Sequence, residues 1–216
     1  MQPQEKNTSL EDNWSQYRCP TGISGRKVAA NMNKGHWDLT TWGLEHVSIK
    51  PDFAILDVGC GGGKTLSRLA RRAVQGQVYG IDHSADMVDY SRQVNKKPIA
   101  TKHAEIMQGS AEKTGFKDDF FDLVTAIETY YFWPNLAEAF LEIKRILKNG
   151  GCLIIINEMI KDGIYEMENA AIIAKTQVHL VPLQEIQKML YSVGFSSVKV
   201  YRKRKSDWNA ILAQKL

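Results

Sequence analysis

The amino-acid sequence predicts an α/β protein with a mostly parallel, doubly wound sheet that carries helices on both faces. Two observations predict this fold. Short apolar runs of β-strand length alternate with stretches of helical periodicity through most of the 216 residues. The run at 121–127 is apolar at most positions, as a parallel strand covered on both faces must be. Alternating strands and helices favour a parallel sheet with a helix in each crossover.

The first unit of this pattern contains a glycine-rich loop. A strand is expected at 53–56 and a helix at 65–74, and four of the five residues 59–63 between them are glycines. Strand, glycine loop and helix open a nucleotide-binding βαβ unit, in which the turn is tight and the ligand approaches the backbone closely.

The later elements continue the alternation. Ser84 is a suitable N-cap for a helix, and Asn149-Gly150-Gly151 reads as a helix C-cap. Residues 158–181 show no regular pattern. The remaining strands are expected at 77–82, 104–108, 121–127, 152–157, 197–201 and 208–213, and the remaining core helices at 84–95, 135–149 and 182–193.

Two carboxylates narrow the class of nucleotide. The glycines follow the pattern D-x-G-x-G-x-G, whereas the dinucleotide pattern GxGxxG would need glycine where Lys64 stands. Asp57 would repel a pyrophosphate but suits an amino group or a ribose hydroxyl. Asp82 closes the second strand, where an acid accepts hydrogen bonds from ribose hydroxyls. The pair indicates a nucleoside without phosphates that carries a positively charged tail.

These residues resemble those of the class I S-adenosylmethionine-dependent methyltransferases. The shared motifs appear in the family's order: Asp57-Val58-Gly59-Cys60-Gly61-Gly62-Gly63, Gly80-Ile81-Asp82, Gln108-Gly109-Ser110-Ala111-Glu112, Phe121-Asp122-Leu123-Val124 and Leu147-Lys148-Asn149-Gly150-Gly151. The resemblance is to the small-molecule type with a ubiquinone/menaquinone-methyltransferase-like core. It implies a Rossmann-like, seven-stranded sheet with an antiparallel last strand, and S-adenosyl-L-methionine as the cofactor.

The resemblance also implies a domain organisation. Residues 1–216 are expected to form one methyltransferase domain, with a flexible segment at 1–13, N-terminal lid helices within 14–50 and a core at 51–216. Two short helices are expected at 25–32 and 34–47. This part of the chain is rich in large side chains: Trp14, Tyr17, Met32, His36, Trp37, Trp42 and Leu44. They either close over the cofactor cleft as a lid or only pack the helices onto the sheet.

The cofactor site follows from the matched motifs. Ser110 departs from the family pattern, which usually has an acid there, so adenine recognition is expected to depend more on backbone groups. Met87 also suits helix packing, and Glu112 also suits a solvated position. The expected cofactor-binding residues are Asp57, Gly59, Cys60, Gly61, Gly63, Asp82, His83, Met87, Ser110, Ala111, Glu112, Ile127 and Glu128.

The loop after the fourth strand is the most reaction-like feature. Glu128 is followed by the aromatic run Tyr130-Tyr131-Phe132-Trp133, which shapes an acceptor pocket and attracts the sulfonium, or else fills the core. Glu128, Tyr131 and His36 are the candidate catalytic residues, each able to accept a proton. Further candidates for the substrate wall are His36, Tyr17, Asn157, Tyr165 and His179. The five histidines and three cysteines show no metal-ligand spacing, so no metal is expected.

Composition bounds the partners and the compartment. Hydrophobic residues make up 44% of the chain and charged residues 24%, and no apolar run reaches membrane-spanning length. Three cysteines and a polar N-terminus favour a reduced, cytoplasmic protein. The net charge is +4, and the basic run 202–205 falls between two expected strands, where a solvated hairpin turn outweighs a nucleic-acid contact.

The predicted function is methyl transfer from S-adenosyl-L-methionine to a small-molecule acceptor by a monomer or homodimer. Three alternatives stay open at this point. The first is an RNA or protein methyltransferase. If the acceptor is RNA, the binding of RNA would weaken steeply as the salt concentration rises. A non-catalytic S-adenosylmethionine-binding protein would bind without turnover. An NAD-dependent oxidoreductase would bind NAD instead.

Overall fold

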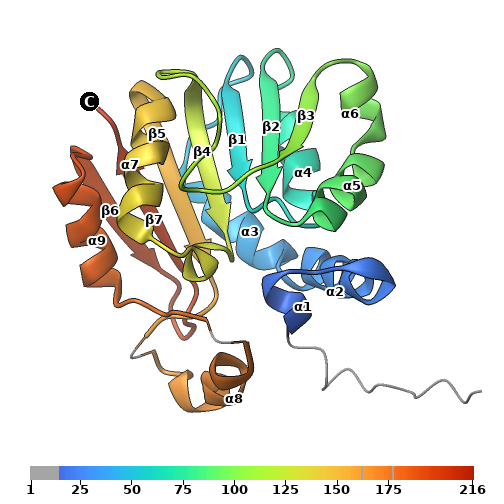
Figure 1. Ribbon diagram of the computed structural model, residues 1–216. Coiled ribbons are helices and arrows are strands. Elements are labelled where there is room, and N and C mark those ends of the chain that lie inside the picture. The colour runs from blue at the N-terminus through green and yellow to red at the C-terminus, as the bar shows by residue number, and fades with distance from the viewer. Residues whose placement is uncertain (1–14, 162, 177) are drawn as a thin grey trace, which may run out of the picture.

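The computed structural model describes residues 15–161, 163–176 and 178–216, and its centre is a seven-stranded sheet (Figure 1). The strand order is β3-β2-β1-β4-β5-β7-β6, and β7 runs antiparallel to both of its neighbours. This confirms the predicted doubly wound sheet with an antiparallel last strand. The strands are β1 (Ala54–Val58), β2 (Gln77–Asp82), β3 (Ala104–Gln108), β4 (Phe121–Ile127), β5 (Leu147–Asn157), β6 (Ser197–Arg202) and β7 (Asn209–Gln214).

Helices cover both faces of the sheet. One face packs against α7 (Leu136–Ile146) and α9 (Leu183–Ser192). The other face packs against α3 (Trp37–Gly43), α4 (Lys64–Arg72) and α5 (Ala85–Val94). Leu56 and Ile55 belong to opposite cores, because successive side chains of a strand point to opposite faces. The central strands are therefore buried on both sides, which explains their nearly continuous apolar sequences.

Several helices gather beyond the carboxyl ends of the parallel strands (Figure 1). They are α1 (Ser15–Arg18), α2 (Gly22–Gly35), α3 and α8 (Glu166–Thr176). The predicted helices at 25–32 and 34–47 correspond to α2 and to α3 with the short 3₁₀ turn η2 (Leu44–His46), and the chain bends between them at His36. The expectations for 1–13 and for Trp14 fall outside the described residues.

The predicted C-cap at Asn149-Gly150-Gly151 is wrong. Helix α7 ends at Ile146, and these residues belong to the irregular first half of β5. The N–H of Gly150 donates to the carbonyl of Lys215, and the N–H of Lys215 donates to the carbonyl of Gly151, at 2.8 and 2.9 Å. Long-range strand pairing therefore satisfies backbone groups that a helix end would leave free.

Two more local features can be set against the sequence, of which the first differs from expectation and the second agrees with it. Residues 96–100 form a short helix, α6 (Lys96–Ala100), because proline at position 98 is tolerated in a first helical turn. The basic run ends β6 and forms the turn to β7, as predicted, and Nζ of Lys203 lies 3.7 Å from the centre of the Trp208 ring. Within the described residues, no helix is both long and apolar enough to cross a membrane.

Candidate active site

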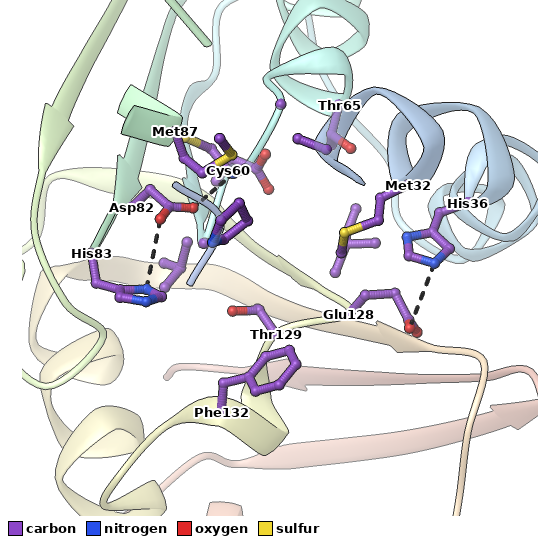
Figure 2. Close-up of a pocket in the computed structure, with 18 of the residues that line it drawn as sticks. Met32, His36, Cys60, Thr65, Asp82, His83, Met87, Glu128, Thr129 and Phe132 are labelled. Carbon is purple, nitrogen blue, oxygen red and sulfur yellow. Dashed lines mark hydrogen bonds and ion pairs between the residues drawn. The ribbon is translucent and has the colours of Figure 1, made fainter. Parts of the chain in front are cut away.

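The carboxyl ends of β1, β2 and β4 open into a cavity of about 290 Å³ (Figure 2). The loops after these strands form its floor, and residues of α1, α2 and α3 form the facing wall. This is the edge at which ligands bind in doubly wound sheets, because the strand order reverses beside β1 and leaves a crevice.

The glycine loop turns sharply under this cavity. Gly59 has φ +71°, and a Cβ atom there would lie 2.2 Å from Oγ1 of Thr129. The N–H groups of Gly59 and Cys60 both donate to the carbonyl of Ile81, which fixes the loop against β2. Glycine is therefore required at 59 for both conformation and space.

Asp57 is buried at the end of β1. Its Oδ1 accepts a hydrogen bond of 2.6 Å from Oγ1 of Thr125 on β4. Burial raises the pKa of Asp57 to about 7, the Thr125 hydroxyl lowers it in part, and the nearby charge of Asp82 raises it further. A buried carboxylate of this kind is stabilised when a cation binds beside it, which suits the cationic tail inferred from the sequence.

Asp82 is held by backbone N–H groups on both oxygens. Gly61 donates to Oδ2 at 2.8 Å, and Ser84 donates to Oδ1 at 2.9 Å. Nδ1 of His83 lies 3.6 Å from Oδ1, with the histidine side chain half exposed. The lone pairs of Asp82 that remain are therefore available to hydroxyl donors in the cavity.

The predicted adenine side also faces the cavity. Met87 is fully buried and Ala111 is buried, and both line it. Ser110 forms an isolated bridge with Lys113, which turns the chain after β3. Glu112 also lines the cavity, and its Oε1 accepts a hydrogen bond from the N–H of Asn135 at 3.4 Å.

Glu128 is the buried acid at the inner end of the cavity. It follows β4 with φ +56°, and its side chain is only 3% exposed. The hydroxyl of Tyr131 donates to Oε2 and the N–H of Glu158 donates to Oε1, both at 2.5 Å. Burial raises the pKa of Glu128 to about 7, while the charge of His36 lowers it.

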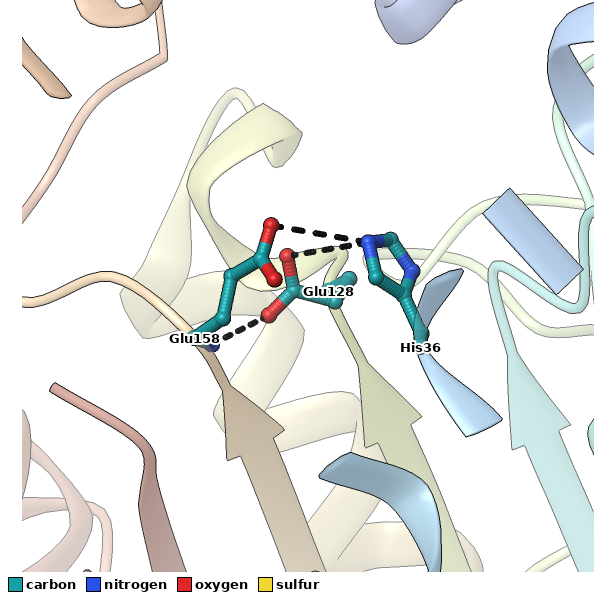
Figure 3. Close-up of side chains that lie close together, drawn as sticks. All are labelled: His36, Glu128 and Glu158. Atoms are coloured by element: carbon teal, nitrogen blue, oxygen red, sulfur yellow. Dashed lines mark hydrogen bonds and ion pairs between the residues drawn. The ribbon is translucent and has the colours of Figure 1, made fainter. Parts of the chain in front are cut away.

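His36 brings the N-terminal helices to this acid (Figure 3). Its Nε2 lies 3.9 Å from Oε2 of Glu128 and 3.5 Å from Oε1 of Glu158. Burial alone would lower the pKa of His36, but the contact with Glu158 and the two carboxylate charges outweigh it and raise the pKa. The potential ligand atoms of the three side chains all lie within 4.8 Å of one another. Glu158 carried no signal in the sequence, because its partners are distant in the chain.

The N-terminal helices, which were expected to form a lid, contribute several side chains to the cavity lining. Tyr17, Met32, His36 and Trp37 line it together with the glycine loop. Nδ2 of Asn33 on α2 donates to the carbonyl of Gly62 at 3.1 Å, which joins a wall helix to that loop. Trp42 lies elsewhere and packs against His46 and Trp208.

Other predicted residues do not reach the cavity. Tyr131 does not line it but donates to Glu128, which does, and Gly63 supplies the N-cap of α4. Asn157 is fully buried against Asn209. Tyr165 lines a second hollow, and His179 is exposed on the loop before α9. The expectation that Asn157, Tyr165 and His179 wall the cavity is therefore corrected, and Tyr131, a candidate base, lies behind Glu128 and outside the lining. Local sequence shows that a polar residue follows a strand, but not which side chain turns inward.

Several further residues line the cavity without having been predicted, among them Asn33, Thr65 and Thr129. Asn33 and Thr129 each contact a glycine of the loop, so their positions depend on the close approach of backbone segments.

Comparison with known proteins agrees with this geometry. The model of a family described as a methyltransferase domain matches residues 56–155. A demethylmenaquinone methyltransferase of Lactiplantibacillus plantarum is 25% identical over 190 residues, which cover 77% of this chain and 79% of that protein. Cycloartenol-C-24-methyltransferase 1 of Oryza sativa subsp. japonica is 30% identical over 124 residues, which cover 57% of this chain and only 36% of that protein.

A solved structure shares the fold along nearly the whole chain. It belongs to the complex between the Haloferax volcanii Trm112 methyltransferase activator and a methyltransferase described as putative. The TM-score is 0.79 at 18% identity, and the match covers 95% of this chain and 99% of that one. The family-model match, the relatives and the fold agree, and together they support a class I S-adenosylmethionine-dependent methyltransferase.

Proposed function

We propose that this protein transfers the methyl group of S-adenosyl-L-methionine to a small, partly apolar acceptor by in-line displacement. The observation that carries the proposal is one shared cavity, which is lined by the assigned cofactor residues Asp57 and Asp82 and by the buried acid Glu128. Asp57 is assigned to the cofactor's amino group, Asp82 to the ribose hydroxyls, and the pocket beside Met87 and Ala111 to adenine.

The acceptor is assigned to the space between Glu128, the lid and the aromatic loop. Phe132 and Trp133 of the aromatic loop line the cavity, and so does Tyr17 of α1. Aromatic faces attract the sulfonium by roughly 0.5–2 kcal/mol per contact and leave an apolar wall for the acceptor. The names of the two relatives, a demethylmenaquinone and a cycloartenol methyltransferase, support a largely apolar small molecule.

The chemistry asks little of the protein beyond alignment, because the sulfonium is already activated. Holding donor and acceptor in line can supply about 7–11 kcal/mol of the barrier. Where the nucleophile arrives protonated, Glu128 is placed to accept its proton, and Tyr131 acts only by orienting Glu128. His36 lies next to Glu128 and completes the inner wall.

Calorimetric titration with S-adenosylmethionine, S-adenosylhomocysteine and NAD⁺ tests the cofactor assignment. Micromolar binding of the first two and none of NAD⁺ is the expected result. Turnover is then measured as S-adenosylhomocysteine formed with each member of an acceptor panel, namely an aromatic thiol, a hydroquinone and an aromatic amine, and with RNA as the alternative acceptor. Binding of NAD⁺ alone would reject the proposal. Turnover with RNA but with none of the small acceptors would move the enzyme to another acceptor class.

We also propose a cytoplasmic protein whose fold needs no disulfide. Cys19, Cys60 and Cys152 are all free thiols, and Cys60 is buried beside Ser91. Unchanged thermal stability with and without a reductant is the expected outcome, and a lower melting temperature under reduction would contradict it.

A further inference from the structure

Glu158 lies between two hollows of the molecule. It follows β5 and lines a second hollow of about 520 Å³, which Tyr165 and the turn 203–208 also line. Its side chain is 42% exposed, whereas that of Glu128 is 3% exposed. Glu128 lines the inner cavity and Glu158 does not, so the two acids face different compartments.

His36 lies between these acids. The same nitrogen, Nε2, is 3.9 Å from Glu128 and 3.5 Å from Glu158, and the histidine side chain is 21% exposed (Figure 3). The N–H of Glu158 also donates to the carboxylate of Glu128, which keeps the two acids adjacent. Both distances are longer than those of well-formed hydrogen bonds, and contacts of this kind often tighten only when a substrate is bound.

A proton on Glu128 needs a route to solvent, because the side chain of Glu128 is only 3% exposed. With cofactor and acceptor in the cavity, water is excluded from Glu128, and a proton received there has no direct exit. The second hollow, called the outer hollow from here on, is open to solvent, and Lys203, Arg204 and Lys205 line it. Their positive charge attracts the anionic buffer bases that finally take the proton.

We propose that His36 and Glu158 carry the proton released by the acceptor from Glu128 to the outer hollow. The proposal rests on the proposed function. In the step, the bond between the methyl carbon and sulfur breaks, and its electron pair stays on sulfur as the thioether. The acceptor atom forms the new bond to the methyl carbon, and its proton passes to Glu128, then to Nε2 of His36, then to Glu158 and a buffer base. Glu158 thus acts through His36 as a positioning and relay residue, without touching the acceptor.

The groups that face His36 come from several elements. Glu128 follows β4, Glu158 follows β5, and Tyr131 lies behind Glu128. Beyond Glu158, the outer hollow adds Asp207, whose two oxygens are held by the N–H groups of Ile164 and Tyr165. Because Asp207 is bonded in this way, Glu158 is the carboxylate assigned to the exchange with solvent.

The relay is tested by steady-state turnover with an acceptor that must lose a proton, such as the hydroquinone. Glu158→Gln is expected to leave the affinity for S-adenosylmethionine and the KM for the acceptor unchanged, and to lower kcat about tenfold in dilute buffer. Imidazole added to the solution is expected to restore kcat, because an external base replaces the lost carboxylate. An acceptor that is already ionised releases no proton, so the unmodified enzyme and Glu158→Gln are expected to methylate it at equal rates. Glu105→Gln, on the edge strand β3, is the matched carboxylate control.

A second measurement needs no acceptor. In labelled protein, NMR gives the rate at which the proton on Nε2 of His36 exchanges with water. Glu158→Gln is expected to slow that exchange several-fold, while the ring of His83, which is half exposed, keeps its rate. This result stands even where every panel acceptor fails, so failure of the relay and of the proposed function are distinguishable.

Three results would overturn the relay. The first is an exchange rate at His36 that Glu158→Gln leaves unchanged. The second is a loss of kcat in that variant that no concentration of imidazole restores. The third is turnover of the unmodified enzyme that a chelator abolishes and a divalent ion restores, because the three side chains would then serve as metal ligands.

Discussion

Oγ1 of Thr125 donates a hydrogen bond of 2.6 Å to Oδ1 of Asp57, and the two residues are register partners on the adjacent strands β4 and β1. This bond is the contact that opposes the effect of burial on Asp57. The acid that we assign to the cofactor's amino group is therefore tuned by the strand beside it, and not by the glycine loop alone.

Cofactor binding is expected to weaken in acid. Burial raises the pKa of Asp57 to about 7, so protonation below that pH removes the charge that a cation needs. Affinity for S-adenosylmethionine should fall by up to about tenfold per pH unit below 7. Calorimetry at pH 6, 7 and 8 measures it, and Asp57→Asn should bind weakly with little dependence on pH. An identical pH slope in that variant would place the titrating group elsewhere.

The same raised pKa has the opposite sign for the stability of the unliganded protein. Between pH 4 and 7 the folded state binds more protons at Asp57 than the unfolded state does, so the contribution of this group to the free energy of unfolding falls as pH rises. Urea unfolding without cofactor should therefore show Asp57→Asn gaining stability relative to the unmodified protein as the pH increases through this window. A difference that is constant with pH would contradict it.

Thr125→Val should weaken the cofactor site with little change of shape. The side chain is fully buried, and losing its hydroxyl removes a hydrogen bond to a charged group, worth about 1.5–3 kcal/mol. The pKa of Asp57 should rise further, so the pH midpoint of cofactor binding should move upward. Thr176→Val is the control, because its hydroxyl donates to a carbonyl of its own helix. Equal effects of the two substitutions on cofactor affinity would contradict the assignment.

Gly59→Ala should cost more than the same change at Gly115. Both glycines have positive φ, +71° and +79°, so both variants carry a backbone strain of roughly 1–2 kcal/mol. At 59 the new methyl group would also meet Oγ1 of Thr129 at 2.2 Å, whereas at 115 nothing lies within 4 Å. Urea unfolding should show the larger loss of stability at 59, accompanied by loss of cofactor binding at that position only. Similar losses of stability in the two variants would show that the Thr129 side chain moves aside at no cost.

Asp82→Asn should reduce affinity for the cofactor more than it reduces stability. One oxygen becomes an NH₂ group that cannot accept from Gly61 or Ser84, and an acceptor for the ribose hydroxyls is lost. Asp89→Asn, at an exposed ion pair on α5, is the control. Calorimetry should show a clear decrease for the first variant alone.

The N-terminal helices are expected to become protected when cofactor binds. Asn33 on α2 already bonds to the glycine loop, and Trp37 on α3 lines the cavity. Hydrogen exchange should slow over 22–43 on addition of S-adenosylhomocysteine, with no change over 183–192 in α9. Equal exchange in both states would reduce these helices to packing elements.

Much of the fold was predictable because its signals are local. The strands at 77–82, 104–108 and 121–127 were predicted with the bounds that the structure shows, since a buried strand must be apolar along its own length. The turn at 149–151 was misread because a glycine pair marks a helix end and an irregular strand equally well. The pairing with Lys215 decides between the two.

The site divides in the same way. The sequence by itself determined the candidate cofactor end: a carboxylate near the end of each of two strands, with glycines between them, names Asp57, Asp82 and Gly59. Tertiary structure decided the inner end, where His36, Glu128 and Glu158 meet from segments 92 and 30 residues apart. The physical reason is that a motif constrains only neighbouring residues, whereas the meeting of three distant side chains follows from the packing of a helix pair against the ends of β4 and β5.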